Sequence, residues 1–351
     1  MKSVSEITST KDRNLFNDIR QMIESSRSSV AVTVNAGMTM LYWQIGKRVR
    51  DEILGGKRAE YGQEIVVSLS RQLTIDYGNS FSEKNLRRMV QFADVFPDEK
   101  IVVSLIRQLT WTHFIALIPL KDQLQRDFYA EICRLERWSV STLRQKIGGM
   151  LFERTAIAKK PKHVIDHEIK TLREKDKLTP DLVFRDPYFL DFLGLKGSFH
   201  GKDLESAILR ELEGFIMELG VGFTFVERQK RMIVDGDDFY LDLLFYHRNL
   251  RRLVAIELKL DKFKPDFKGQ MELYLRWLDK YERKTGEEHP IGLILCAGKS
   301  NERIELLELD KSGIRVAEYM TELLPKELLE KKFHEAIKRA RLYFENKRIE
   351  K

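Results

Sequence analysis

The sequence contains no apolar run of 18 residues and no basic-plus-apolar leader, so we expect a protein that neither crosses a membrane nor is exported. Only two cysteines are present, Cys133 and Cys296, and their separation fits neither a zinc site nor a disulfide framework. The seven histidines show no metal-ligand spacing either. These absences exclude the zinc-binding and disulfide-rich classes and predict reduced core thiols in a cytoplasmic protein.

Length and charge indicate the broad class of the protein. A chain of 351 residues suggests two domains of ordinary size, each able to bury its own core. The net charge is +7, and 33% of the residues are charged. This excess favours a polyanionic partner, although many solvated helical surfaces are equally charged.

A hairpin pattern lies in the second half of the chain. Two β-prone runs, Phe239–Tyr246 and Leu253–Leu260, flank the short connection formed by residues 248–251. If the hairpin is symmetric about that connection, Asp242 lies directly opposite Glu257, with Cβ atoms roughly 5 Å apart. Side chains alternate along a strand, so Lys259 joins Glu257 on one face. We expect Ile256, Leu258 and Leu260 to point into the core.

Two facing carboxylates in apolar surroundings repel each other and are costly to desolvate, and a divalent cation is the usual way to neutralise them. Oxygen ligands are those that Mg²⁺ or Mn²⁺ prefers. The pattern therefore predicts a hydrolase of phosphate esters, in which Lys259 positions the attacking water or donates to a phosphate oxygen. The alternative is an exposed edge hairpin in which Glu257 and Lys259 form a solvated ion pair and Asp242 has no role.

A helix that begins near Pro265 follows the hairpin and carries Gln270 and Tyr274 on one side. Together, Asp242, the run IELK at 256–259 and the run QMELY at 270–274 resemble the PD-(D/E)XK nuclease superfamily. The longer string from Leu241 to Leu275 is similar to the YhcG-type nuclease domain in particular. This sequence has Leu241 where many members of the superfamily have a proline.

The resemblance implies a role for each matching residue. Asp242 and Glu257 would bind the metal with help from the backbone carbonyl of Leu258, and Lys259 would be catalytic. Related nucleases add an acidic residue from their first helix, for which Glu205 is the candidate here. Glu211, or a charge with a purely structural role, competes with Glu205. We expect Gln270 and Tyr274 to orient the substrate or a water molecule.

The order of elements also matches this family. A helix over 204–219 is followed by three strands, the helix with Gln270, a strand, a closing strand and a C-terminal helix from Pro325 onwards. This order predicts the αβββαβ core of a restriction-endonuclease-like fold, an α/β domain with a mixed sheet covered on both faces. We predict an N-terminal helical domain over 1–155, a basic linker over 156–180 and a nuclease domain over 181–351.

The N-terminal region has the periodicity of an all-α domain: one amphipathic helix starts at Leu15, and a second, longer one continues from Val30 through Val49 and ends at Gly55. A helix near 63–76, a short polar turn and a basic helix capped by Ser82 form a helix-turn-helix pattern. The basic helix carries Lys84, Arg87 and Arg88, which we predict to contact DNA. A helical hairpin with an ordinary solvated face is the alternative. The run YGNSFSEKNLRRMVQF resembles the N-terminal domain of the same family, which implies DNA binding or assembly into a homo-oligomer.

We therefore expect a Mg²⁺-dependent or Mn²⁺-dependent nuclease that acts on DNA. The hairpin connection is basic, and we predict that Arg248, Arg251 and Arg252 contact phosphate, with His247 touching phosphate or solvent. Two other classes compete with this interpretation. One is a non-catalytic DNA-binding or scaffold protein that has kept the nuclease fold, and the other is a helical module that binds other proteins.

Overall fold

A computed structural model describes residues 10–55, 59–195 and 201–349 of the chain. It divides into two compact units, Met1–Gln145 and Lys146–Lys351, which are described separately below. Within the described residues, every helix is too short or too polar to cross a membrane.

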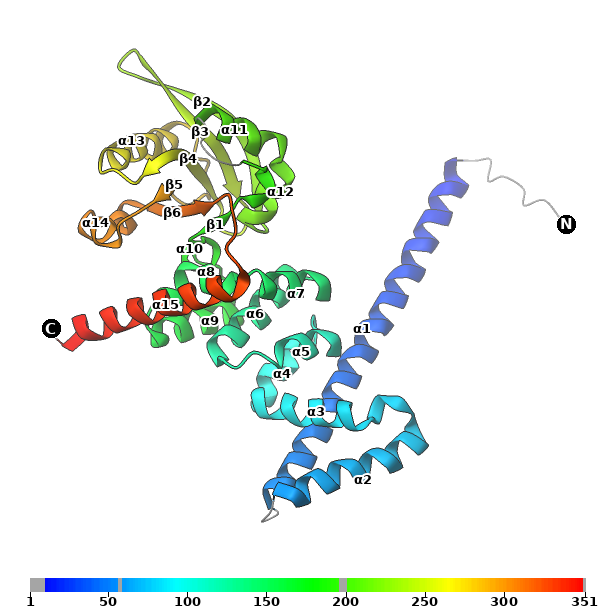
Figure 1. The fold of residues 1–351 in the computed structure, drawn as a ribbon. Coiled ribbons are helices and arrows are strands. Elements are labelled where there is room, and N and C mark those ends of the chain that lie inside the picture. Colours follow the sequence, from blue (N-terminus) through cyan, green and yellow to red (C-terminus); the bar gives the residue numbers. More distant parts are fainter. Residues whose placement is uncertain (1–9, 56–58, 196–200, 350–351) are drawn as a thin grey trace. The chain divides into compact units, whose positions relative to one another are not determined.

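The first unit is entirely helical, as the sequence predicts (Figure 1). The two helices expected before Gly55 are a single continuous helix, because no residue between them breaks the helical pattern. The helices are α1 (Thr10–Gly55), α2 (Ala59–Tyr77), α3 (Glu83–Val95), α4 (Glu99–Leu105), α5 (Trp111–Leu117), α6 (Gln123–Glu136) and α7 (Val140–Gly148), the last of which runs past the end of the unit.

The core of this unit forms where α1, α2 and α3 pack together. One cluster of buried side chains there consists of Tyr42, Val49, Val66, Leu86 and Met89. A Cβ atom built on Gly46 would lie only 1.8 Å from the carbonyl oxygen of Met89, so the backbones of α1 and α3 approach as closely as a glycine allows. The helix-turn-helix pattern predicted from the sequence corresponds to α2, a short turn and α3.

The second unit combines a sheet with flanking helices. The segment predicted as a basic linker contains α9 and belongs to this unit; the domain boundaries expected from the sequence stay a prediction. The helices are α8 (Leu151–Arg154), α9 (Lys162–Lys175), α10 (Pro180–Val183), α11 (Gly201–Arg210), α12 (Leu212–Leu219), α13 (Asp266–Tyr281), α14 (Asn301–Leu306) and α15 (Lys326–Ile349). The strands are β1 (Tyr188–Phe189), β2 (Phe223–Val234), β3 (Asp237–His247), β4 (Arg252–Lys262), β5 (Ile291–Gly298) and β6 (Ile314–Met320).

The six strands form one mixed sheet in the order β1-β6-β5-β4-β3-β2. Strands β2, β3 and β4 pair antiparallel as two hairpins, whereas β4, β5, β6 and β1 pair parallel. The αβββαβ order expected from the sequence is thus confirmed. The two-residue strand β1 was not expected, because so short a segment carries no alternating pattern.

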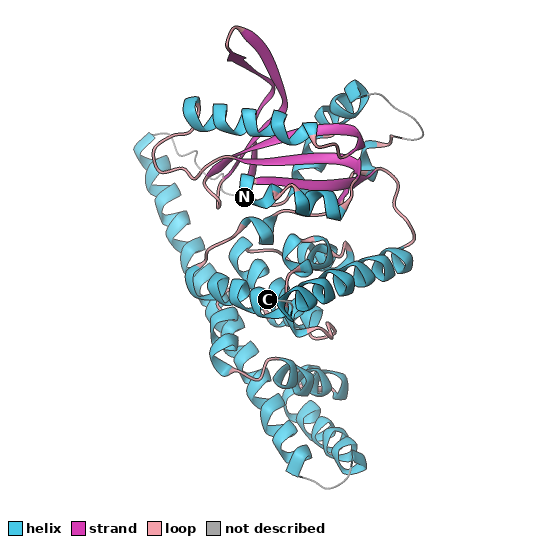
Figure 2. Cartoon of the chain, turned by 90° about the vertical axis from the view of Figure 1, so that its left-hand side faces the viewer, coloured by secondary structure: helices cyan, strands magenta, loops and turns pink. Residues whose placement is uncertain are grey.

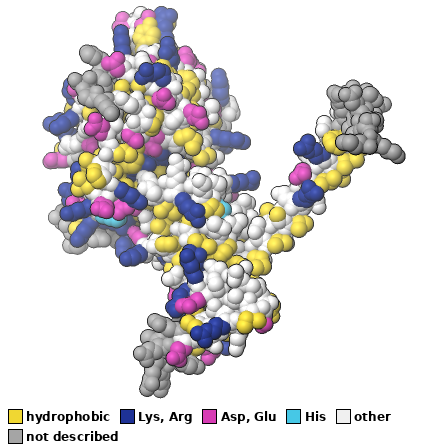
Figure 3. All heavy atoms as spheres, turned by 45° about the vertical axis from the view of Figure 1, so that its right-hand side comes forward, with side chains coloured by type: hydrophobic (Ala, Val, Ile, Leu, Met, Phe, Trp, Pro, Cys, Tyr) yellow, Lys and Arg dark blue, Asp and Glu magenta, His cyan; other side chains and the backbone are white. Residues whose placement is uncertain are grey.

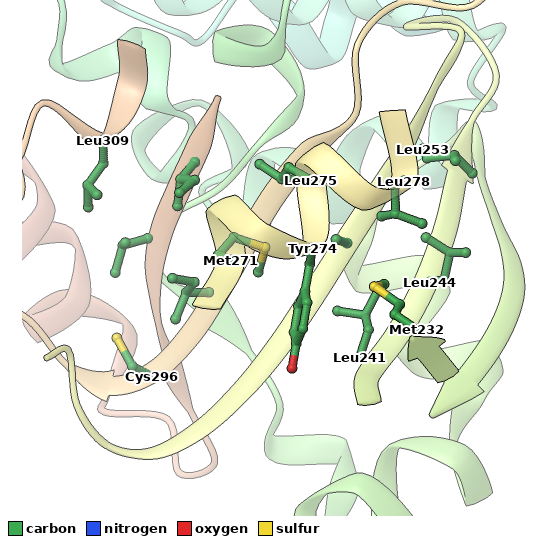
Figure 4. Close-up of a cluster of buried hydrophobic side chains, with 14 of the residues drawn as sticks. Met232, Leu241, Leu244, Leu253, Met271, Tyr274, Leu275, Leu278, Cys296 and Leu309 are labelled. Atoms are coloured by element: carbon green, nitrogen blue, oxygen red, sulfur yellow. The ribbon is translucent and has the colours of Figure 1, made fainter. Parts of the chain in front are cut away.

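Helices cover both faces of the sheet (Figure 2). On one face, Met271, Tyr274, Leu275 and Leu278 of α13 pack against buried side chains of five strands, β2 to β6 (Figure 4). On the other face, Phe215 of α12 packs against Phe245 of β3, with ring centroids 6.0 Å apart. A sheet buried on both sides explains why β4 and β5 read as nearly continuous apolar runs.

The hairpin of β3 and β4 has the register that the sequence predicts. Its pairs run from His247 opposite Arg252 to Leu243 opposite Ile256, which is the predicted symmetry about residues 249 and 250. Ile256 is fully buried, as expected, but Leu258 and Leu260 are only half-buried because they lie near the end of the strand. Counted from the turn, the last backbone pair is Leu243 opposite Ile256, and Asp242 is the next residue of β3 beyond it.

The prediction that His247 touches phosphate or solvent is wrong. Its side chain is fully buried, packs edge-to-face on Phe223 and accepts the N–H of Leu250 at Nδ1, 3.1 Å away. Burial is the main reason why the pKa of His247 is lowered to about 4, and the nearby charge of Arg252 adds to the effect.

The burial of His247 predicts a loss of stability in acid. The unfolded chain binds a proton at this residue below a pKa of 6.5, whereas the folded protein resists it down to about 4. The burial of His247 costs no stability above pH 6.5. As the pH falls below that value, the free energy of unfolding decreases, by about 2 kcal/mol at pH 4.5. In His247→Asn, where the amide oxygen replaces the Nδ1 acceptor, the midpoint of thermal unfolding should fall less over this range. The exposed His163→Asn is the control, and equal pH dependence of all three proteins contradicts the prediction.

Candidate active site

The site begins where the ladder between β3 and β4 stops. Side-chain oxygens take over from backbone pairing at this point: Oδ2 of Asp242 accepts the N–H of Leu258 at 2.8 Å. In return, the N–H of Asp242 donates to Oε1 of Glu257 at 3.3 Å. The two predicted carboxylates therefore lie side by side and are held by each other's backbone, with Leu258 between Glu257 and Lys259 on β4.

Glu257 is the more buried member of the pair. Only 3% of its surface is exposed, whereas Asp242 is half-buried. The pKa of Glu257 is raised to about 7, mainly by burial and also by the neighbouring Asp242, while Lys259 opposes both effects. The exposed-hairpin alternative does not describe this pair, because Glu257 meets Lys259 in a buried setting and not in solvent.

A chain of hydrogen bonds leads from Glu257 to α13. Lys259 Nζ donates to Oε2 of Glu257 at 2.7 Å and to Oε1 of Gln270 at 3.2 Å. Nε2 of Gln270 then donates to the hydroxyl of Tyr274 at 2.7 Å, and that hydroxyl donates to the carbonyl of Tyr240 at 3.2 Å. The four predicted polar side chains of β4 and α13 are thus brought together, and the chain ends on β3.

Gln229 is a site residue that the sequence did not reveal. Its Nε2 donates to Oδ1 of Asp242 at 3.2 Å and to Oε2 of Glu205 at 3.0 Å. A φ of +47° places Gln229 in an irregular part of β2, so strand alternation alone gave no signal. Glu205 on α11 is thereby linked to Asp242, whereas its competitor Glu211 is exposed at the start of α12.

The carboxylates have the chemistry for a divalent cation. Among the residues with described coordinates, no group of three or more His, Cys, Asp or Glu side chains is close enough to hold a metal ion. Mg²⁺ needs fewer protein ligands than that, since it commonly binds one or two carboxylates and keeps several waters. A buried Glu257 beside Asp242 is a negative centre of that kind, which Lys259 compensates only in part. The residues present therefore fit such an ion.

The predicted DNA-contacting residues of α3 are accessible to different degrees. Lys84 and Arg87 are exposed, and Arg88 is half-buried with Nη1 3.5 Å from Oδ1 of Asn85. Arg87 forms an ion pair with Glu83 one turn earlier, with 2.7 Å between Nη2 and Oε1. The other face of α3 is apolar and buries Leu86, Met89, Phe92 and Ala93.

The basic connection between β3 and β4 lies at the far end of the hairpin from the carboxylates. Six residues separate Asp242 from Arg248, which corresponds to roughly 20 Å along a strand. Arg248 and Arg251 are exposed, and Arg251 Nη2 lies 3.8 Å from Glu288. Arg252 is half-buried and donates to the carbonyl of Leu250. The structure therefore does not bring these three arginines together with the carboxylate site.

Comparison with known proteins identifies the family. A family model described as the DUF1016 N-terminal domain matches residues 18–154, and one described as the YhcG PDDEXK nuclease domain matches residues 181–334. The chain is also 32% identical to "Putative nuclease YhcG" of Escherichia coli (strain K12), over 85% of this chain and 87% of that protein. The chain belongs to the YhcG family. The YhcG nuclease-domain match contains Glu205, Asp242, Glu257, Lys259, Gln270 and Tyr274.

Two solved structures show weaker likenesses. A repair endonuclease from Pyrococcus abyssi is 22% identical, with 37% of this chain and 50% of that chain covered and a TM-score of 0.26. The structure of an EndoMS–dsDNA complex is 20% identical, with 37% and 49% covered and a TM-score of 0.27. This chain thus spans about half the length of these two proteins, and the TM-scores are too low to support an argument.

The position of Gln229 between two carboxylates predicts a metal-dependent stability defect. Gln229→Glu replaces the bridging donor by a third negative charge, so the metal-free protein should unfold at a temperature lower by roughly 2–8 °C, the effect of about 1–2 kcal/mol in a domain of this size. Millimolar Mn²⁺ or Mg²⁺ should restore most of this loss, because a cation offsets the repulsion.

Gln145→Glu is the matched control, since it adds the same charge at an exposed glutamine. Thermal unfolding in chelator and in added metal should show no metal-dependent recovery for that variant. If Gln229→Glu is destabilised and added metal does not restore its unfolding temperature, Gln229 stabilises only the local structure of β2.

Proposed function

We propose that this protein is a divalent-metal-dependent nuclease that hydrolyses phosphodiester bonds in DNA, with Mg²⁺ or Mn²⁺ as the cofactor. One observation carries the proposal. A buried Glu257 beside Asp242 is connected through Lys259 to Gln270 and Tyr274 by an unbroken series of hydrogen bonds. Membership of a family whose C-terminal domain is described as a nuclease supports the same activity.

The carboxylates supply the negative charge that would hold the cation. The proposed ligands are Asp242, Glu257 and the backbone carbonyl of Leu258, and Glu205 is linked to Asp242 through Gln229. A cation bound there supplies positive charge against the phosphodiester and lowers the pKa of a water molecule. Glu257 must be ionised to bind it, and the charge of Lys259 favours that ionised form.

Lys259 is the proposed catalytic residue. Its ammonium group has three donors, and two of them are directed to Glu257 and Gln270. The third is left for a phosphate oxygen or for the attacking water. Nζ also lies 5.1 Å from the centre of the Phe267 ring, which limits the positions that the flexible side chain can take. A fixed donor of this kind stabilises charge that develops on the phosphate during hydrolysis.

Gln270 and Tyr274 act in this proposal as positioning residues. The Tyr274 hydroxyl fixes the orientation of the Gln270 amide, so that the amide oxygen faces Lys259. Tyr274 is itself held by burial of its ring in the core and by the carbonyl of Tyr240. The hydrophobic core on this face of the sheet therefore controls where the Lys259 charge lies.

Cleavage by the full-length chain tests the proposed function. With Mg²⁺ or Mn²⁺, the protein should cleave at least one of duplex, single-stranded and branched DNA, and excess chelator should stop the reaction. Asp242→Asn and Glu257→Gln should each reduce the rate by about 100-fold or more, since a bound metal contributes several kcal/mol to transition-state stabilisation.

Asp237→Asn, an exposed carboxylate on the same strand, is the matched control and should keep the wild-type rate. Circular dichroism and thermal unfolding establish that each variant is folded. Absence of cleavage on all three substrates would disprove the proposal and favour a non-catalytic DNA-binding protein. Full activity of Asp242→Asn would disprove the assignment of Asp242 to the metal site.

We assign DNA affinity to the first unit through Lys84, Arg87 and Arg88 of α3. In the inactive Asp242→Asn background, replacing all three by alanine should weaken DNA binding and flatten the slope of log affinity against log salt by about one unit for each phosphate that the variant no longer binds. Binding measured between low and high salt gives this slope. Arg48→Ala is the control, because Arg48 pairs with Glu52 on α1 in the same way that Arg87 pairs with Glu83. An unchanged slope in the triple variant would contradict the assignment.

A further inference from the structure

The first two thirds of α1 carry a row of large apolar side chains that nothing in its own unit covers (Figure 3). Their exposed fractions range from 38% to 71%, although side chains of this type are normally buried. The row, called the α1 stripe below, consists of Leu15, Phe16, Ile19, Met22, Ile23, Val30, Val34, Met38 and Leu41.

The stripe lies on the opposite side of α1 from the side that packs within the unit. At about 100° per residue, the stripe covers one side of the helix, and Thr39, Trp43 and Gly46 cover the other. Thr39 and Trp43 are buried, and Gly46 touches the backbone of α3. The α1 stripe is therefore not the outer edge of the unit's own core but a second apolar face.

The spacing of the stripe is that of a helix which packs along another helix. Phe16, Ile19, Ile23 and Val30 follow steps of three, four and seven residues, and Ser26, Thr33 and Gly37 interrupt the apolar repeat. A repeat of seven residues keeps one face of a helix in register with a second helix over a long distance. Arg27, Val30, Ala31 and Val34, which line a shallow hollow on this helix, have the spacing of four residues that surround an inserted side chain between two packed helices.

We propose that the α1 stripe pairs with the α1 stripe of a second copy of this chain, so that the protein is a dimer held together by its N-terminal helices. The nine side chains expose on the order of 500 Å² of apolar surface, near the upper limit for a monomeric protein. Two such stripes bring together on the order of 1,000 Å², which is the area at which a stable interface begins.

The charges beside the stripe favour a second copy over other occupants. Asp18, Arg20, Glu24 and Arg27 flank it with equal numbers of each sign, and the stripe itself holds no charged residue. A helix that lies on a membrane surface carries an excess of Lys and Arg on its polar face, and a DNA-binding face requires cations. Balanced charge of this kind is instead self-complementary between two identical helices. The pairing does not depend on the proposed nuclease activity.

Sedimentation velocity of the full-length chain tests the pairing. The wild type should sediment as a dimer at about 10 µM, and Val30→Glu should raise the dissociation constant by at least about tenfold because it buries a charge in the pair. Val32→Glu is the matched control. It changes the same residue type on the same helix, but Val32 points away from the stripe and is 50% exposed. Its dissociation constant should stay within about twofold of the wild type.

A second variant shows whether the weaker dimer results from the stripe as a whole or from a local effect of one substitution. Ile19→Glu, about three turns before Val30, should weaken the dimer to a similar degree, and circular dichroism should show that the helix content of both variants is retained. A wild type that stays monomeric up to about 100 µM would overturn the proposal. Equal weakening of the dimer by Val30→Glu and Val32→Glu, or no weakening by either variant, would also overturn the proposal, because the contact between the two copies would then lie elsewhere.

Discussion

The desolvation of Glu257 beside Asp242 is the constraint around which the second unit is organised. A carboxylate that is 97% removed from solvent next to a second one is costly unless it is protonated, paired or bound to a cation. Lys259 supplies part of the compensation, and Gln270 and Tyr274 keep Lys259 in place. The raised pKa of Glu257, about 7, shows that this compensation is incomplete. A bound divalent cation would complete it.

The fold creates this situation by ending a strand ladder early. Beyond Leu243 and Ile256 the two strands no longer pair through their backbones, and the carboxylates of Asp242 and Glu257 accept the N–H groups left over. On the other side of β3, the irregular residue Gln229 places its amide against Asp242 and Glu205. Helix α13 then covers the same region with Tyr274 and its apolar neighbours. Each of these elements positions one polar group, and the site exists only where all of them meet.

The sequence predicted those features that depend on local pattern. The register of the hairpin followed from its short turn, so the meeting of Asp242 with Glu257 could be anticipated, and the spacing of Gln270 and Tyr274 placed both on one side of a helix. Gln229 could not be found this way, because its role depends on a positive φ and on a contact with α11 that is distant in sequence. His247 was misjudged for a related reason: its burial comes from Phe223 on another strand. The continuity of α1 was missed because an exposed apolar stripe looks like the edge of a core.

The position of a bound metal ion tests most directly whether Asp242 and Glu257 hold a divalent cation. A crystal of the full-length protein grown with Mn²⁺ and measured at the manganese absorption edge would locate the ion without reference to activity. We expect an anomalous peak at about 2.0–2.2 Å from an oxygen of Asp242 and from an oxygen of Glu257, with the Lys259 ammonium nearby. An ion bound elsewhere, or no ion at these carboxylates in crystals of a protein that cleaves DNA, would contradict it.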